Sequence, residues 1–471
     1  MAPARQTSFA RIIEKWQKEK GPLRIMSASG QLGYGIIEKA FRAGLERDLH
    51  LIGADMGSVD PGPYYLGSGK LATARRSTKR DLKMVLVGAL SMKVPLVIGT
   101  AGTAGGDTHL DQTLEIIREI AREEGLTFRL ATIRSEMPRD LIKKQARAGK
   151  VTSIGPIPEL TDAEIDKAAC IVGQAGTEAF VRAIDTLPDV IIAGRACDTG
   201  IYTCLPEKLG FPIGPALQMA KIIECASLAC EGGGRDAMLG TLEGESFVLE
   251  SMNPARRATP MSVAAHGLYE QADPLSVAEP EGVLYLEDSK FEAVDDRRCR
   301  VSGGRWVPTK QYSVKIEGAT RVGARAIMVA GSADPVFIEK ADEIAGLVEA
   351  QIRELVPPKP ENPYTLYFRF YGLGVVGGQP VTQLPEEVGV MVEVIGEDED
   401  EARAVAATAK QYLLHAPFPG RISTAGNLGF PFTPPELTAG DAYRFSVYHI
   451  MQVDALAPLF PVAVEEVASS K

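Results

Sequence analysis

The first half of the chain alternates short apolar runs with longer stretches in which apolar residues recur every three or four positions. The short runs predict buried strands, and the longer stretches predict amphipathic helices. Segment 162–186 fits either a helix or a strand followed by a helix. Strands are expected at 23–26, 49–52, 94–98, 127–131 and 190–193, and helices at 5–20, 36–48, 70–92, 109–124, 135–148 and 215–231.

Strands that alternate with helices favour an α/β fold, because each helix crosses over from one parallel strand to the next. For residues 1–240 we therefore predict an α/β domain with a mostly parallel sheet and helices on both faces. We expect this domain to carry the main site.

The pattern changes after residue 240. Shorter β-like runs at 282–286, 298–301 and 312–316 predict a β-rich insert or linking subdomain over 241–323. Residues 324–471 predict an α+β domain, in which two β-α-β units pack on a mixed sheet. Its expected strands are 325–330, 364–370, 387–396 and 443–450, and its expected helices are 334–355 and 398–414.

Composition and net charge limit which binding partners and which cellular compartment are expected. The net charge of −10 argues against nucleic acid or an anionic membrane as the main partner. None of the six cysteines forms a CxxC pair, so the sequence holds no zinc-ribbon or thioredoxin motif. Neither a signal peptide nor a membrane span is evident. We expect a cytoplasmic protein.

The expected strands end in glycine-rich turns that carry carboxylates or an arginine. The clearest are 52–65, 99–109 and 194–199. In open α/β sheets, ligands bind outside the carboxyl ends of the strands. We therefore expect these turns to meet at one crevice.

The turn 52–65 is both acidic and rigid. Pro fixes φ and Gly permits positive φ, so the backbone around Asp55 and Asp60 is bent and stiff. Paired carboxylates can divide acid and base roles, or hold a divalent cation such as Mg²⁺. Ser58, Tyr64 and Tyr65 are expected to face the substrate. The alternative is that each aspartate caps a turn.

The turn 99–109 is rich in small residues and precedes a helix. Backbone amides there, around Thr103, Gly105 and Gly106, suit a carboxylate or phosphate. Asp107 is a third candidate metal ligand, or a helix N-cap. The turn lacks the Walker A and dinucleotide patterns, and segment 29–35 is a poor match to the latter. No nicotinamide or flavin is expected.

Three further segments offer charged candidates. Arg195 presents a fork for a substrate carboxylate, with Asp198 nearby, although the two could form a structural pair. Glu224 stands in an otherwise apolar helix, where burial would raise its pKa and suit an acid, or where it could be a paired structural residue. Arg235 could reach an anion. His266 could share a helical face with Glu270, or lie on a surface helix.

Five segments together resemble the acyclic terpene utilisation family AtuA, namely 55–67, 102–107, 193–198, 231–234 and 427–431. The resemblance spans most of the chain and is weaker in the middle segment. It implies a role in bacterial breakdown of branched terpenoid acids as CoA esters; other relatives are described as lyases on methyl-branched or hydroxylated dicarboxylates. It also implies a small AtuA-related partner protein.

We expect a hydratase or dehydratase, a lyase that moves water across a double bond beside a carboxylate or CoA thioester. Such a reaction needs an acid, a base and stabilisation of enolate-like charge. Asp55 or Asp60 would be the base and Glu224 the acid, with His266 as a further catalytic candidate. Arg195, with Arg235, would hold the substrate carboxylate.

Two alternatives stay open. A carbon–carbon lyase or thioesterase on a branched acyl-CoA would need a basic groove near Lys70, Arg75, Arg76 and Lys79. A non-catalytic partner subunit of a degradation complex would turn over neither acids nor CoA esters. We expect an oligomer in each case.

Overall fold

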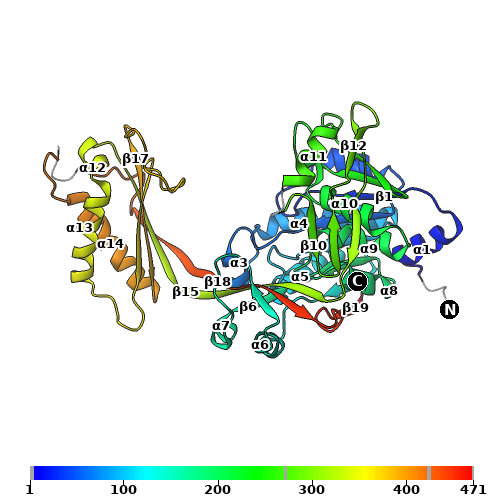
Figure 1. Cartoon of the computed structure of the whole chain (residues 1–471), viewed down its shortest axis with the longest axis horizontal. Helices are drawn as coiled ribbons and strands as arrows, with labels where there is room; N and C mark the ends of the chain where they lie inside the picture. Colours follow the sequence, from blue (N-terminus) through cyan, green and yellow to red (C-terminus); the bar gives the residue numbers. More distant parts are fainter. Residues whose placement is uncertain (1–4, 270–272, 422–425, 469–471) are drawn as a thin grey trace. The chain divides into compact units, whose positions relative to one another are not determined.

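The computed structural model describes residues 5–269, 273–421 and 426–468. The chain forms two compact units. The first comprises Met1–Thr320 together with Phe445–Lys471, and the second comprises Arg321–Arg444. Residues 241–320 therefore belong to the first unit. Figure 1 shows the order of the elements along the chain.

The first unit alternates helices and strands over its first two hundred residues, as the apolar pattern predicts. Its helices are α1 (Ser8–Lys18), α2 (Glu38–Leu45), α3 (Pro63–Ser68), α4 (Arg75–Met92), α5 (Asp107–Glu124), α6 (Arg139–Arg147), α7 (Asp162–Lys167), α8 (Thr177–Asp185), α9 (Asp198–Lys208), α10 (Ile213–Ile223) and α11 (Pro260–Tyr269), with a 3-10 turn η1 at Ala226–Ala229. Its strands are β1 (Leu23–Ser27), β2 (Leu51–Asp55), β3 (Leu96–Gly99), β4 (Phe128–Ile133), β5 (Val151–Ser153), β6 (Cys170–Gly173), β7 (Val190–Ala193), β8 (Met238–Glu243), β9 (Ser246–Ser251), β10 (Ser276–Glu279), β11 (Gly282–Tyr285), β12 (Lys290–Ala293), β13 (Arg298–Ser302), β14 (Arg305–Pro308) and β19 (Val462–Val467).

A ten-stranded sheet in the order β12-β13-β9-β8-β1-β2-β3-β7-β4-β19 is the centre of the first unit. The α/β class is confirmed, but the prediction of a mostly parallel sheet is wrong. In the described residues four pairings, those among β1, β2, β3, β7 and β4, are parallel and five are antiparallel. The reason is that strands from 238–302 and from the C-terminus extend the same sheet at its two ends, which local periodicity does not reveal.

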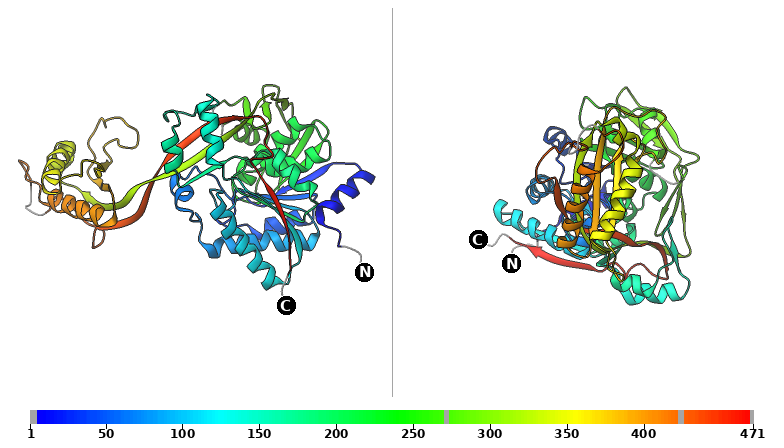
Figure 2. Two further views of the ribbon diagram at one scale, coloured as in Figure 1. Left: turned by 90° about the horizontal axis from the view of Figure 1, so that it is seen from below. Right: turned by 90° about the vertical axis from the view of Figure 1, so that its left-hand side faces the viewer.

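Helices cover both faces of the parallel strands. Alternate residues of β3 belong to different cores: Val97 packs with α8, α9 and α10, whereas Leu96 and Ile98 pack with α2, α4 and α5. This is the alternation expected of a strand that is buried on both sides. Figure 2 shows light-blue helices on one side of this sheet and green helices on the other.

Helix α10 ends earlier than the helix expected over 215–231. Ile223 is its last residue, and Glu224 is the C-cap. Residues 226–229 then form the separate turn η1, with Ala226 at a φ of 53°. Glu224 therefore stands at a helix end rather than in mid-helix.

The second unit packs helices against an antiparallel sheet. Val388, Val390, Val392 and Val394 of β17 alternate into its core. The described pairings are antiparallel, so the expected mixed sheet is not found. Its elements are α12 (Pro335–Glu339), α13 (Ala341–Leu355), β16 (Thr365–Tyr371), β17 (Val388–Gly396) and α14 (Glu399–His415), while β15 (Tyr312–Ser332) and β18 (Glu436–Val453) run through both units.

Among the described residues, no helix combines the length and the apolar character that crossing a membrane requires.

Candidate active site

Three strand-end turns of the first unit lie against one another. A Cβ built on Gly57 would be 3.0 Å from the Cα of Thr103. A Cβ on Gly105 would be 2.2 Å from the backbone nitrogen of Arg195, whose N–H donates to the Gly105 carbonyl over 2.9 Å. Side chains larger than hydrogen would separate these turns, so the glycines allow the turns after β2, β3 and β7 to meet.

A cavity of about 350 Å³ opens beside the turn after β2. Its lining includes five of the residues expected from the sequence: Asp55, Ser58, Asp60, Asp198 and Glu224. They come from β2, the following turn, α9 and the end of α10. The other lining residues are Gly30, Gln31, Gly57, Lys221 and Cys225.

Asp55 is buried in this cavity, and its exposed fraction of 6% equals that of Glu224. The Gly57 N–H donates to its Oδ2 over 2.8 Å, whereas its Oδ1 is buried and has no hydrogen-bond partner among the described residues. Burial, with the nearby Asp198 and Glu224 carboxylates, raises the pKa of Asp55 well above its ordinary value. A carboxyl group in this environment favours its protonated form, which is the form that can donate a proton.

Asp60 differs from Asp55 although both belong to the same turn. It is solvent-exposed. Its backbone N–H donates to Ser58 Oγ over 3.1 Å, so the Ser58 side chain caps this turn. The capping alternative instead describes Asp55, whose Oδ2 accepts from the Gly57 N–H. Asp60 lines the cavity, but it stays exposed to solvent.

Glu224 forms an ion pair inside the same cavity. Lys221 Nζ lies 2.7 Å from Glu224 Oε1, and the Glu224 side chain is only 7% exposed. An ammonium this close favours the ionised carboxylate. The cavity therefore holds a buried acid, Asp55, and a cation-paired carboxylate, Glu224.

A second cavity of about 140 Å³ shares Asp198 and Lys221 with the first. Glu279, at the end of β10, is buried in its wall; Thr199 Oγ1 donates to Glu279 Oε1 over 2.7 Å. Burial raises the pKa of Glu279. Burial, with nearby Glu279 and Glu281, also raises the pKa of the Cys197 thiol well above its ordinary range, so Cys197 is a poor nucleophile.

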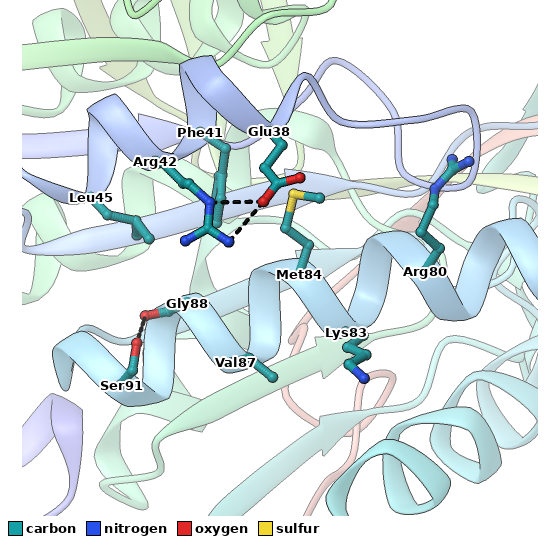
Figure 3. A pocket seen from close by; sticks show the side chains of 10 residues that line it. All are labelled: Glu38, Phe41, Arg42, Leu45, Arg80, Lys83, Met84, Val87, Gly88 and Ser91. Carbon is teal, nitrogen blue, oxygen red and sulfur yellow. Dashed lines mark hydrogen bonds and ion pairs between the residues drawn. The ribbon is translucent and has the colours of Figure 1, made fainter. Parts of the chain in front are cut away.

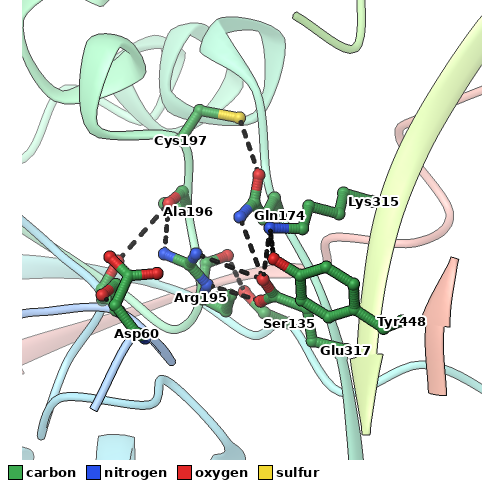
Figure 4. Close-up of polar contacts among 11 residues, drawn as sticks. Asp60, Ser135, Gln174, Arg195, Ala196, Cys197, Lys315, Glu317 and Tyr448 are labelled. Atoms are coloured by element: carbon green, nitrogen blue, oxygen red, sulfur yellow. Dashed lines mark hydrogen bonds and ion pairs between the residues drawn. The ribbon is translucent and has the colours of Figure 1, made fainter. Parts of the chain in front are cut away.

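Arg195 is buried, and its guanidinium group pairs with Glu317, a partner that the sequence pattern did not indicate. Its Nε lies 2.8 Å from Glu317 Oε2, and its Nη1 donates to the Ala196 carbonyl over 3.2 Å. Lys315 Nζ lies 2.9 Å from Glu317 Oε1. Figure 4 shows this network, in which Arg195 points toward Glu317 rather than into an open space. Arg195 thus lines the second cavity as a fixed charge that is already paired with Glu317.

Backbone carbonyl groups accept from four amides of the turn 99–106. The N–H groups of Thr100 and Ala101 donate to residues 194 and 193, and those of Thr103 and Gly105 donate within the turn. Gly106 is the N-cap of α5 and lies close to Cys170. These bonds engage the amides of Thr103 and Gly105, two of the three residues expected to form a carboxylate or phosphate cradle.

The three expected metal ligands do not form a metal-binding group. Asp107 pairs with Arg134 over 3.1 Å, and its N–H donates to Glu136. In the part of the chain that the structure describes, no group of three or more His, Cys, Asp or Glu residues is arranged to hold a metal ion. Asp55 and Asp60 are thus brought to one cavity without Asp107.

Four other candidates are not among the described residues that line either cavity. Tyr64 and Tyr65 stack edge to face on α3, and the Tyr65 carbonyl contacts His109. Arg235 is exposed and lies over the Tyr34 ring. His266 is buried on α11, and its expected partner Glu270 lies outside the described residues.

A groove between α2 and α4 has a similar volume, about 320 Å³, but a different lining. Figure 3 shows Glu38 paired with Arg42 in a wall that also holds Phe41, Leu45 and Met84. It lacks the convergent carboxylates of the strand-end cavity, so it is the weaker candidate for chemistry.

Sequence reasoning missed Lys221 and Glu279. Lys221 precedes Glu224 by three residues, a spacing that places both on one face of a helix, so this signal was available. Glu279 lies in a short β-like segment, and nothing local distinguishes it from a surface glutamate.

Comparison with known families gives a match over most of the chain. The model of the family described as "Acyclic terpene utilisation family protein AtuA" matches residues 77–428. This range contains the 102–107, 193–198 and 231–234 segments but not the Asp55 turn, and it ends at Leu428. No curated protein and no solved structure matches the chain.

Proposed function

Because this chain belongs to the acyclic terpene utilisation family AtuA, we propose that the Asp55 cavity is the active site of a hydratase or dehydratase acting on a small hydroxylated or branched carboxylic acid. The observation that carries the proposal is the buried Asp55 carboxyl with its unpartnered Oδ1, in one cavity with the Lys221–Glu224 pair.

The proposed roles follow from the environments of the two carboxyl groups. In the dehydration direction, the Glu224 carboxylate takes a proton from the carbon beside the substrate carboxylate. The neutral Asp55 carboxyl gives its proton to the departing hydroxyl, so that a carbon–carbon double bond forms and water leaves. Such general acid–base transfers contribute about 10²–10⁴-fold each. These roles reverse those expected from sequence, because burial favours protonated Asp55.

Lys221 is the cation best placed to hold the substrate carboxylate. It lines both cavities, and its ammonium can stabilise the negative charge that develops when the adjacent carbon loses its proton. Arg195, paired with Glu317, lines the smaller cavity and adds to this positive potential. Asp198 lines both cavities and raises the pKa of Asp55.

The size and surroundings of the cavity favour a free acid over a CoA ester. A volume of about 350 Å³ is at the lower end of the roughly 300–1,000 Å³ of ligand pockets. Arg75 and Lys79, expected in a CoA groove, are both paired with Glu119. The carbon–carbon lyase and thioesterase alternatives rest on that groove and are therefore weaker. Action on a CoA thioester, an oligomer and a small partner protein stay predictions.

The test is a panel of hydroxy acids that includes malate, 3-hydroxypropionate and 3-hydroxyisovalerate, assayed by the ultraviolet absorbance of the conjugated double bond that dehydration forms. We expect the wild type to turn over at least one member, and Asp55→Asn to be at least about 10³-fold slower on that member. A wild-type protein that neither binds nor dehydrates any member would favour the non-catalytic partner subunit.

A further inference from the structure

The smaller cavity contains an unexplained buried carboxylate oxygen. Glu279 Oε1 accepts from Thr199. Oε2 is buried, and no group in the described residues meets hydrogen-bond geometry with it, although the weakly donating Cys197 thiol lies near the carboxyl. A buried polar atom without a partner costs about 1–3 kcal/mol, so a ligand that supplies one would recover that cost. The proposed acid–base reaction does not use Glu279.

The two cavities can hold two parts of one molecule. They share Asp198 and Lys221, so an acid bound at Lys221 would have its other end beside Glu279. The smaller cavity, at about 140 Å³, has room for a few water-sized groups, since a water occupies about 30 Å³ in the liquid. It suits a short polar substituent rather than a second chain.

The charges around this cavity favour a neutral group. Lys221 and the buried Arg195 would repel a substrate ammonium, while Asp198 and Glu279 would repel a second carboxylate. An apolar substituent would leave Glu279 Oε2 unsatisfied. A hydroxyl is neutral, donates one hydrogen bond and accepts others, so it can serve Glu279 whether that carboxyl is ionised or neutral.

We propose that Glu279 binds a second, non-reacting hydroxyl of the substrate, so that the preferred substrates are dihydroxy acids. Thr199 fixes the Glu279 carboxyl, and Oε2 accepts from the substrate hydroxyl. The Gln174 side chain, in the same wall, is within reach of Glu317 and Cys197 and completes a polar lining. This inference rests on the proposed function, because it requires the acid to bind at Lys221.

The experiment compares pairs of acids that share the reacting hydroxyl and differ by one further hydroxyl, namely glycerate with 3-hydroxypropionate and 2,3-dihydroxyisovalerate with 3-hydroxyisovalerate. Dissociation constants are measured by calorimetry on the full-length wild type and on Glu279→Met. The methionine side chain has a similar length, but it offers a substrate hydroxyl neither a donor nor a strong acceptor. Glu245→Met, at an exposed site, is the matched control.

For the wild type we expect about tenfold tighter binding of at least one dihydroxy member, which corresponds to one hydrogen bond of about 1.4 kcal/mol. Glu279→Met should remove this preference and leave the affinity for the monohydroxy member within about twofold. Glu245→Met should keep the preference. Equal wild-type affinities within both pairs, or a preference that survives in Glu279→Met, would overturn the subsite.

The wild-type comparison tests the subsite even if Glu279→Met does not fold. The two proposals also fail differently. If 3-hydroxypropionate or 3-hydroxyisovalerate is dehydrated without any preference for the dihydroxy partner, only the Glu279 subsite fails. If no acid binds or reacts, the proposed function fails and the subsite fails with it.

Discussion

At the residue scale, Asp55 and Asp60 show how one sequence motif can hold two different acids. Asp55 ends a strand that is buried on both faces, so its carboxyl leaves water when the sheet forms. Asp60 lies five residues later on the exposed side of the turn. The motif predicts a pair of carboxylates. The burial of Asp55 and the exposure of Asp60 are what favour Asp55 as the proposed proton donor.

Asp55→Asn should reduce kcat by about 10³-fold, because the amide fills the same space but cannot supply the proton. Asp60→Asn, in the same turn, should reduce kcat by less than about tenfold. Steady-state assays on the responsive hydroxy acid measure both. Equal losses in the two variants would contradict the separate roles given to these residues.

The raised pKa of Asp55 also predicts a stability effect with a definite sign. Between its ordinary pKa of 3.8 and its higher folded-state pKa, the folded protein binds more protons than the unfolded chain, so this group lowers stability as pH rises. Asp55→Asn removes that dependence. Its Tm should match the wild type near pH 4 and exceed it increasingly toward neutral pH, in scanning calorimetry across that range. A gap that shrinks with rising pH would be the opposite of this expectation.

At the element scale, the site depends on where strands and helices stop. β2, β3 and β7 end in turns that touch, and α10 ends at Ile223 so that Glu224 can pair with Lys221. The polar groups come from the ends of separate elements, and the backbone contacts between those ends fix their spacing.

Gly105→Ala tests the contact between the turns. Its new Cβ would lie 2.2 Å from the Arg195 nitrogen at a φ of +69°, which combines overpacking with left-handed strain and should cost about 3 kcal/mol. Gly125→Ala has a nearly identical φ of +64° but nothing within 4 Å, and should cost about 1 kcal/mol. Urea unfolding of both variants measures the difference, and equal costs would show that the turns can move apart.

Lys221→Met tests the proposed carboxylate anchor on α10. Loss of a charge-assisted hydrogen bond of about 1.5–3 kcal/mol should raise KM for a responsive acid by about 10–100-fold. Lys83→Met is the control. Lys83 of α4 pairs with Glu124 of α5, and neither residue lines either of the two strand-end cavities. If the two variants have the same KM, Lys221 does not hold the substrate.

At the scale of the whole molecule, all the residues of the proposed site belong to the first unit, whereas the second unit has a core of its own. The chain leaves the first unit after Thr320 and returns at Phe445. Thr320 Oγ1 and Ser446 Oγ lie 2.8 Å apart, so the two chain ends are neighbours.

Replacing Arg321–Arg444 with a short glycine-containing turn should therefore leave a folded first unit. We expect the shortened chain to bind the responsive acid with a Kd within about threefold of the full chain, measured by calorimetry. A folded but non-binding product, judged by circular dichroism, would show that the site needs the second unit.

The sequence by itself determined the α/β class, the position of most helices and strands, the AtuA family and five lining residues of the main cavity, because periodicity and strand-end turns are local properties of the chain. Only the tertiary structure decided which strands share a sheet, because the pairing of β8, β9 and β19 joins segments that are distant in sequence. It likewise decided that Glu317 engages Arg195, that Lys221 and Glu279 join the site, and that Asp55 is buried while Asp60 is not. The physical reason is that burial and charge pairing depend on neighbours in space, and those neighbours cannot be read from the local order of residues.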